Sequence, residues 1–254
     1  MDSGYGIYIP SRQRPKNRIT KWLAINEVPA TFVVEKEDYQ AYAEISPSYH
    51  TIRVLPESNM GLGYARHWIQ INSKERYIAM FDDDLVLGIQ RSWSEKGYWI
   101  YDRKVPRECI EHGFSVLKEK NLGALGCEYI AFACRSKVKY TQNRGLEGAV
   151  FYDKEKFRGA LYGASFRLHE DRDFMLQLLN LGTSFLISNV LSKDTGRSCQ
   201  AGASGGCATD YKNDSRNLFL RRLQEKWGKE QVRLVQDKHG LDSRINYDFF
   251  FGTR

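Results

Sequence analysis

The first 90 residues alternate between short runs of β-forming residues and stretches with helical spacing. Strands are predicted at residues 5–10, 31–35, 51–55 and 76–81. One helix is predicted to begin at Pro15, a second to span 38–45, and a third to follow the turn 59–63 and end near Asn72. Strands that alternate with helices are joined by right-handed crossovers and form a parallel sheet. Ligands of such sheets bind beyond the carboxyl ends of the strands. The alternation therefore predicts an α/β fold with its site where these strands end.

Three aspartates, Asp82, Asp83 and Asp84, directly follow the fourth predicted strand. Carboxylates this close together repel one another unless a cation neutralises them, so a divalent metal is a natural partner. Because side chains alternate along an extended chain, Asp82 and Asp84 are expected on the same side. The D-x-D spacing taken alone leaves two readings open, a metal site and a solvated acidic loop.

Polar residues also end the first two predicted strands. Pro10 ends the run 5–10 and is followed by Ser11 and Arg12, and Glu35 ends the run 31–35. The carboxyl ends of neighbouring parallel strands meet at one edge of the sheet. We therefore expect these residues to converge with the three aspartates.

The second half of the chain mixes helices and strands. A helix is predicted at 105–120 and another at 168–181, with Gly182 as its C-cap. Glu170 and Asp171 lie in the first turn of the latter, where they either complement the helix dipole or supply a general base. Further strands are predicted at 125–132, 149–152 and 185–191.

Residues 92–101 are rich in aromatic side chains, which favours a half-buried hairpin, with a stacking platform for a sugar or base as the alternative. Residues 202–206 are glycine-rich and predict a loop, because no G-K-[ST] motif follows to make a phosphate cradle. No internal repeat or linker interrupts the sequence. The sequence therefore predicts a single domain, 1–254.

Composition narrows the class of protein. With 254 residues, 42% of them hydrophobic, the chain can bury a sizeable core. No apolar stretch approaches the roughly 20 residues of a membrane span, and residues 1–4 lack the pattern of a signal peptide. Five irregularly spaced cysteines indicate neither a zinc site nor a disulfide framework. These features predict a cytoplasmic protein.

The net charge of +7 is concentrated in three basic clusters, which we number from the N-terminus. Each cluster alone is typical of a solvated face. Three together favour a partner that carries phosphates, either a nucleotide or a nucleic acid. The first cluster is Arg12, Arg14, Lys16, Arg18 and Lys21; the second is Arg135, Lys137, Lys139 and Arg144; the third is Lys212, Arg216, Arg221, Arg222, Lys226 and Lys229.

The order of these motifs resembles that of the GT-A glycosyltransferases. The amino acids within the motifs resemble those of the TET-associated glycosyltransferases. The latter are phage and related enzymes that glycosylate oxidised methyl-pyrimidines in DNA. The resemblance covers most of the chain and implies a Rossmann-like, mostly parallel sheet. It also implies a nucleotide-sugar-binding half at 1–90 and a mixed α+β, acceptor-binding and catalytic half at 91–254. It rests on Ile9-Pro10-Ser11-Arg12, Val33-Val34-Glu35, Asn59-x-Gly61-x-Gly63-x-x-Arg66, Asp82-x-Asp84, His169-Glu170-Asp171 and His239.

The resemblance also implies roles for these residues. Asp82, Asp84 and His239 would hold Mn²⁺ or Mg²⁺, and the imidazole favours Mn²⁺. His239 is otherwise an ordinary surface residue. The ion would bridge the diphosphate of a nucleotide sugar, a UDP-hexose by the resemblance. The donor-binding set would be Pro10, Ser11, Arg12, Glu35, Asn59, Gly61, Gly63, Arg66, Asp82 and Asp83, with Arg12 and Arg66 on the phosphates or uridine unless they are salt-linked surface residues.

The acceptor implied by the resemblance is a hydroxyl of 5-hydroxymethylcytosine or a related base in DNA, bound through clusters near Arg14, Lys137 and Arg221. Asp171 would be the base of an inverting displacement, while Glu170 exchanges roles with it or orients the acceptor. Under retention, Asp171 would stabilise the sugar or acceptor instead. A phage-encoded enzyme would act in the host cytoplasm.

Other functions stay open at this point. A GT-A enzyme acting on a polysaccharide, protein or lipid-linked acceptor keeps the same site. A nucleotidyltransferase or phosphotransferase would use the acids for two-metal chemistry, although no P-loop is present. A non-catalytic DNA-binding module would explain the charge but leave Asp82–Asp84 and Glu170–Asp171 without a role.

Overall fold

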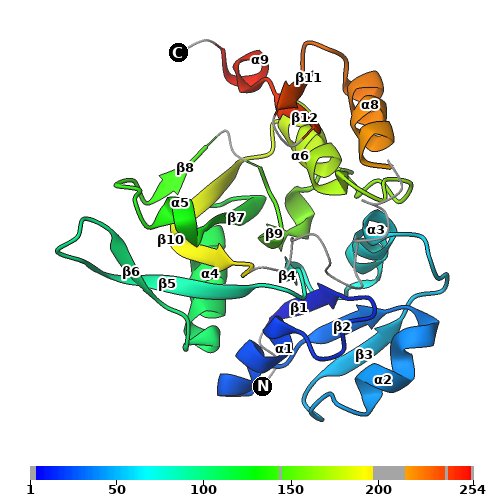
Figure 1. Cartoon of the computed structure of the whole chain (residues 1–254), viewed down its shortest axis with the longest axis vertical. Coiled ribbons are helices and arrows are strands. Elements are labelled where there is room, and N and C mark those ends of the chain that lie inside the picture. Colours follow the sequence, from blue (N-terminus) through cyan, green and yellow to red (C-terminus); the bar gives the residue numbers. More distant parts are fainter. Residues whose placement is uncertain (1–3, 143–144, 197–214, 238–239, 253–254) are drawn as a thin grey trace.

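The computed structural model describes residues 4–142, 145–196, 215–237 and 240–252. A ten-stranded mixed sheet forms its centre, in the order β3-β2-β1-β4-β9-β7-β10-β5-β6, with β8 paired to β10 (Figure 1). The strands are β1 (Tyr5–Pro10), β2 (Thr31–Val34), β3 (Thr51–Val54), β4 (Tyr77–Phe81), β5 (Val86–Trp93), β6 (Trp99–Asp102), β7 (Ala124–Tyr129), β8 (Tyr140–Thr141), β9 (Ala149–Asp153) and β10 (Phe185–Asp194).

The first four strands are parallel, as the alternation of strands and helices predicts. Strand β9 lies antiparallel between β4 and β7, so β7 runs in the same direction as β4. Strand β10 is parallel to β7, and β5 and β6 add an antiparallel hairpin beside it. The carboxyl ends of β1, β2, β4, β7 and β10 therefore share one edge of the sheet, which we call the carboxyl edge.

Helices cover both faces of the sheet (Figure 1). Adjacent residues of β1 show the two faces: Ile9 packs into a core with Trp22 and Phe114, whereas Tyr8 packs into a core with Phe174 on the other side. The first core is covered by α1 (Arg18–Leu23), α2 (Tyr39–Ala43) and α4 (Pro106–Glu119); the second by α3 (Leu62–Asn72), α6 (Glu170–Asn180) and α8 (Ser215–Trp227).

Smaller elements complete the described fold. The antiparallel pair of β11 and β12 packs beside α8, at the top of the view in Figure 1. The remaining elements are η1 (Ala24–Asn26), η2 (Lys36–Asp38), η3 (Lys154–Lys156), α5 (Ile130–Ala133), α9 (Tyr247–Phe251), β11 (Val232–Asp237) and β12 (Gly240–Ile245).

Several predicted elements have different bounds. The strand predicted at 125–132 ends at Tyr129, where the chain turns into α5. The aromatic hairpin begins at Val86 rather than at residue 92. Helix α1 begins at Arg18 because Asn17 caps it, accepting a 2.9 Å hydrogen bond from the Thr20 amide. The predicted loop at 202–206 lies outside the described residues.

Candidate functional site

The predicted convergence at the carboxyl edge is present. Ser11 follows β1 and donates a 2.5 Å hydrogen bond to Asp83 Oδ2, and its hydroxyl also contacts the Tyr42 hydroxyl at 2.5 Å. Arg14 Nη1 lies 3.1 Å from Asp83 Oδ1 and 3.5 Å from Asp84 Oδ2. Burial raises the pKa of Asp83 to about 6, although Ser11 and Arg14 oppose this shift. Asp83 is thus an internal anchor of the loop.

The alternation argument for the aspartates does not apply. Strand β4 ends at Phe81, and residues 83 and 84 form a turn. In a turn, side chains no longer alternate with a period of two. The Asp82 carboxylate accordingly contacts Arg66, whereas the carboxylates of Asp83 and Asp84 contact Arg14.

Arg12, Glu35 and Asn59 form a second group at this edge. Arg12 Nε lies 3.1 Å from Glu35 Oε2, and Arg12 also donates to Asn59 Oδ1. Glu35 Oε1 accepts a 2.8 Å hydrogen bond from the Asn59 amide. Asn59 and Gly61 have φ values of 62° and 90°, which suit asparagine and glycine in the turn before α3. The group ties the end of β2 to this turn.

Arg66 joins α3 to both the acidic loop and α6. Its guanidinium lies 2.6 Å from Asp82 Oδ1 and 2.9 Å from Glu170 Oε1. The side chains of Arg66 and Glu170 are 6% and 5% exposed, and that of Asp82 is 33% exposed. Burial raises the pKa of Glu170 to about 8, and Arg66 opposes this rise. Arg66 is therefore a buried bridge and not a surface residue.

Gly63 explains how α3 reaches α6. A Cβ atom at this position would lie 2.1 Å from the Phe166 carbonyl oxygen and 2.6 Å from that of Gly163. Only glycine permits this close backbone approach. The contact sets α3 against the segment that leads into α6, one turn before Arg66.

Asp171 is the half-buried residue that follows Glu170 in α6. Its Oδ1 atom accepts a 2.7 Å hydrogen bond from the Arg172 amide. Arg172 in turn pairs with Asp242 at 2.7 Å and donates to the Ser243 carbonyl, so it fastens β12 to α6. The helix start that carries Asp171 is held from two sides.

Two further residues near the acidic loop were not assigned from the sequence. The buried Lys193 of β10 donates a 2.7 Å hydrogen bond to the Glu147 carbonyl. The next residue, Gly148, accepts a 2.8 Å hydrogen bond from the Asp82 amide. Burial, followed by the charge of Asp171, raises the pKa of Glu147. The signal for Lys193 was a lysine within a mostly apolar strand.

Asp82 and Asp84 offer hard carboxylate oxygens, which suit Mg²⁺ or Mn²⁺. Their side chains are 33% and 20% exposed, so an ion has access to both. Within the described ranges, no group of three His, Cys, Asp or Glu side chains has an arrangement that could hold an ion. His239 lies outside those ranges. The two aspartates fit the chemistry of a divalent ion, and each faces an arginine.

The three basic clusters differ in how many of their cations are paired with acids. In the first, Arg12, Arg14 and Arg18 pair with Glu35, Asp83 and Asp194 respectively. In the third, Lys226 pairs with the buried Asp173 at 2.6 Å, Arg221 and Arg222 are exposed, and Lys212 lies outside the described residues. In the second, Arg135, Lys137 and Lys139 are exposed, and Arg144 lies outside the described residues.

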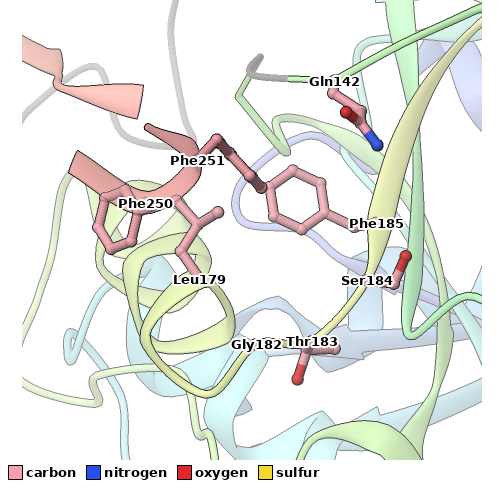
Figure 2. Close-up of a pocket in the computed structure, with 8 residues that line it drawn as sticks. All are labelled: Gln142, Leu179, Gly182, Thr183, Ser184, Phe185, Phe250 and Phe251. Atoms are coloured by element: carbon pink, nitrogen blue, oxygen red, sulfur yellow. The ribbon is translucent and has the colours of Figure 1, made fainter. Parts of the chain in front are cut away.

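A separate open pocket of about 240 Å³ lies at the start of β10, at the opposite end of that strand from Asp194 (Figure 2). Phe251 and Leu179 point into the space that Phe185 closes from the sheet side. Because it lies away from the carboxyl edge, this pocket is no part of the acidic site. It is lined by Gln142, Leu179, Gly182, Thr183, Ser184, Phe185, Phe250 and Phe251.

Comparison with solved structures shows the fold. Glucosyl-3-phosphoglycerate synthase from Mycobacterium tuberculosis, in complex with Mg²⁺ and UDP, aligns with a TM-score of 0.55 and 9% identity over 95% of this chain and 86% of the other. The complex of the same enzyme with Mn²⁺, UDP and phosphoglyceric acid aligns with a TM-score of 0.55 and 10% identity, again over 95% of this chain and 86% of the other. S. aureus TarS 1–349 in complex with UDP aligns with a TM-score of 0.48 and 12% identity over 73% of this chain, and this chain spans only 57% of that 1–349 chain.

The remaining findings concern sequence similarity and membrane-spanning helices. A search of curated proteins finds no match. Among the helices that the structure describes, none has the length and apolar character to cross a membrane. The profile of the TET-associated glycosyltransferase family matches residues 5–202, which include β1–β10 and the acidic loop. The chain therefore belongs to the TET-associated glycosyltransferase family and has the GT-A fold of glycosyltransferases.

Proposed function

We propose that this protein is a metal-dependent glycosyltransferase that moves a hexose from a UDP-sugar to a hydroxyl of 5-hydroxymethylcytosine, or a related modified pyrimidine, in DNA. The observation that carries the proposal is the family match over residues 5–202, a span that holds the convergent acids and arginines of the carboxyl edge. The UDP complexes of the structurally similar synthase support the choice of donor. The family's description supports the acceptor.

Donor binding is assigned to the groups at the ends of β1, β2 and β4. Glu35, held by Arg12 and Asn59, would accept hydrogen bonds from the ribose or uracil. Arg12 and Arg14 would supply positive charge beside the diphosphate. A divalent ion on Asp82 and Asp84 would neutralise charge on the departing diphosphate. His239 remains the proposed third ligand.

Acceptor activation is assigned to Asp171. Its carboxylate would take the proton of the acceptor hydroxyl while that oxygen bonds to the anomeric carbon and the bond to the diphosphate oxygen breaks. Glu170 is held by Arg66, so we assign it to orienting Arg66 and Asp82 rather than to proton transfer. In a retaining reaction, Asp171 would stabilise the sugar instead.

The test is a transfer assay with Mn²⁺, a panel of nucleotide sugars and duplex DNA that contains 5-hydroxymethylcytosine or unmodified cytosine. After digestion, mass spectrometry of the nucleosides should show a hexose-sized gain on the modified base alone. Metal-dependent hydrolysis of one nucleotide sugar without a gain would refute the DNA acceptor and favour a polysaccharide, protein or lipid-linked one. Absence of both would refute the glycosyltransferase.

Two substitutions test the assigned roles. Asp171→Asn should lower transfer by a factor of about 10²–10⁴ while UDP-sugar affinity stays near wild type, because general-base catalysis contributes about that much. Asp84→Ala should remove metal-dependent nucleotide binding as well as transfer. The matched control is Asp248→Asn, an exposed acid in the first turn of α9. Unchanged turnover in Asp84→Ala would refute the metal site.

A further inference from the structure

Large apolar side chains are exposed on the β5–β6 hairpin and on the segment from α5 to β8. Phe132 is 63% exposed and Val138 is 55% exposed. Exposed aromatic groups that gather in one place mark interaction sites. We call this the hairpin surface; its apolar members are Trp93, Tyr98, Phe132 and Val138.

Trp99 joins the two segments into one surface. Its amide donates a 2.8 Å hydrogen bond to the Cys134 carbonyl, and its indole Nε1 donates one of 3.0 Å to the Ser136 carbonyl. The Trp99 ring also packs edge-on against Trp93, with ring centroids 5.0 Å apart. In Figure 1 the β5–β6 hairpin projects from the sheet, while α5 packs on β7 and β10, and β8 pairs with β10.

The charge on the hairpin surface is strongly positive. Four of its residues are exposed cations, and none of them makes an ion pair with another described residue. In residues 93–101 and 130–139 the only acid is Glu95. Basic groups interleaved with exposed rings fit a chain of phosphates with accessible bases. The four cations are Lys96, Arg135, Lys137 and Lys139.

The hairpin surface is connected to the proposed catalytic site by a series of side-chain and backbone contacts. The Gly148 carbonyl accepts a hydrogen bond from the Asp82 amide, and the carbonyl of the preceding residue, Glu147, accepts one from Lys193. The Lys193 ammonium lies 4.2 Å from the centroid of the Tyr129 ring. The Tyr129 ring packs edge-on against Phe132 at 6.5 Å between centroids. A short series of contacts thus leads from the acidic loop to the hairpin surface.

We propose that the hairpin surface binds the DNA strand that carries the acceptor base, with Arg135, Lys137 and Lys139 on phosphates and Phe132 and Tyr98 stacked against unpaired bases. This assignment rests on the proposed function. A second copy of the chain is a poor occupant, because a two-fold contact would place the same positive patch against itself. A stacked strand also suits the acceptor, since a base must leave the helix to reach a catalytic site.

The test measures binding of a fluorescently labelled single strand and of duplex DNA by anisotropy at several salt concentrations. Arg135→Ala with Lys137→Ala should reduce the slope of log K against log salt by about 1.4 for a single strand, because each phosphate contact contributes about 0.7. Phe132→Ala should weaken binding about tenfold without changing that slope. The charge-matched control is Lys74→Ala with Lys118→Ala, two exposed lysines that lie in the loop before β4 and on α4.

Hydrolysis of the UDP-sugar in the absence of DNA is measured for every variant, and retention of wild-type hydrolysis shows that the fold and donor site are intact. If wild type glycosylates DNA and the hairpin variants keep wild-type affinity and salt slope, the hairpin surface is refuted and the proposed function stands. If wild type hydrolyses the donor but neither binds nor modifies DNA, both the DNA acceptor and this surface are refuted. The proposal is also refuted if the hairpin variants lose binding to anionic phosphatidylserine vesicles but bind DNA as tightly as the wild type.

Discussion

Replacing Arg66 tests whether the buried bridge between α3 and α6 holds the site together. Arg66→Met keeps much of the packing volume but removes the charge that faces Glu170 at 2.9 Å. Both side chains are nearly inaccessible to solvent. Removing one partner of a buried pair costs about 3–5 kcal/mol, since the other charge is left uncompensated. The contact of Arg66 with the more exposed Asp82 adds less than about 1 kcal/mol.

The cost should depend on pH. Because the folded-state pKa of Glu170 is raised from 4.5 to about 8, the stability that this group contributes is complete below 4.5 and is lost as pH rises through 8. Arg66 limits that loss, so its removal raises the Glu170 pKa further and extends the loss to higher pH. We therefore expect the full deficit near about pH 9 and a smaller one near about pH 6.

Chemical denaturation at both pH values measures the free energy of unfolding, with thermal melting as a second readout. At 2–4 °C per kcal/mol for a protein of this size, the melting temperature should fall by about 6–20 °C at the higher pH. Arg66→Met with Glu170→Gln should recover part of the loss and abolish its pH dependence. The control, Arg91→Met, breaks an exposed pair with Glu108 and should cost less than about 1 kcal/mol. A deficit as small as the control's, or one equal at both pH values, would refute this reasoning.

Two more substitutions test the packing and the titration of the donor half. Gly63→Ala should destabilise the protein by about 1–3 kcal/mol, because its Cβ would lie 2.1 Å from the Phe166 carbonyl oxygen; a wild-type unfolding curve would contradict the close approach of α3. Burial lowers the pKa of His50 to about 4, so the unfolded chain takes up a proton that the folded protein excludes, and stability is lost as pH falls from 6.5 to 4. His50→Asn, which keeps an acceptor for the Ala30 amide, should flatten that pH dependence by about 1–3 kcal/mol in denaturation at several pH values, and an unchanged slope would assign it to other groups.

The sheet and its functional edge could be predicted because both follow from short-range pattern. Four β-forming runs separated by helices imply parallel strands, and polar residues at their ends imply a shared edge. The directions of the aspartate side chains could not be predicted, because the strand ends one residue before Asp82 and the turn abolishes the alternation. The role of Lys193 was also hidden, since its partner is a backbone carbonyl 46 residues away.

The sequence also cannot show which basic residues are neutralised by acids in the folded protein. A cluster of arginines in the sequence looks alike whether or not acids fold against it, because the acids come from distant segments. Arg14 and Arg18 meet Asp83 and Asp194, which lie 69 and 176 residues away. Their charge is already balanced at the carboxyl edge, so it contributes to shaping the donor site before it attracts any polyanion. Arg135, Lys137 and Lys139 are exposed and make no such pair among the described residues, so their positive charge is available to a phosphate backbone at the proposed hairpin surface.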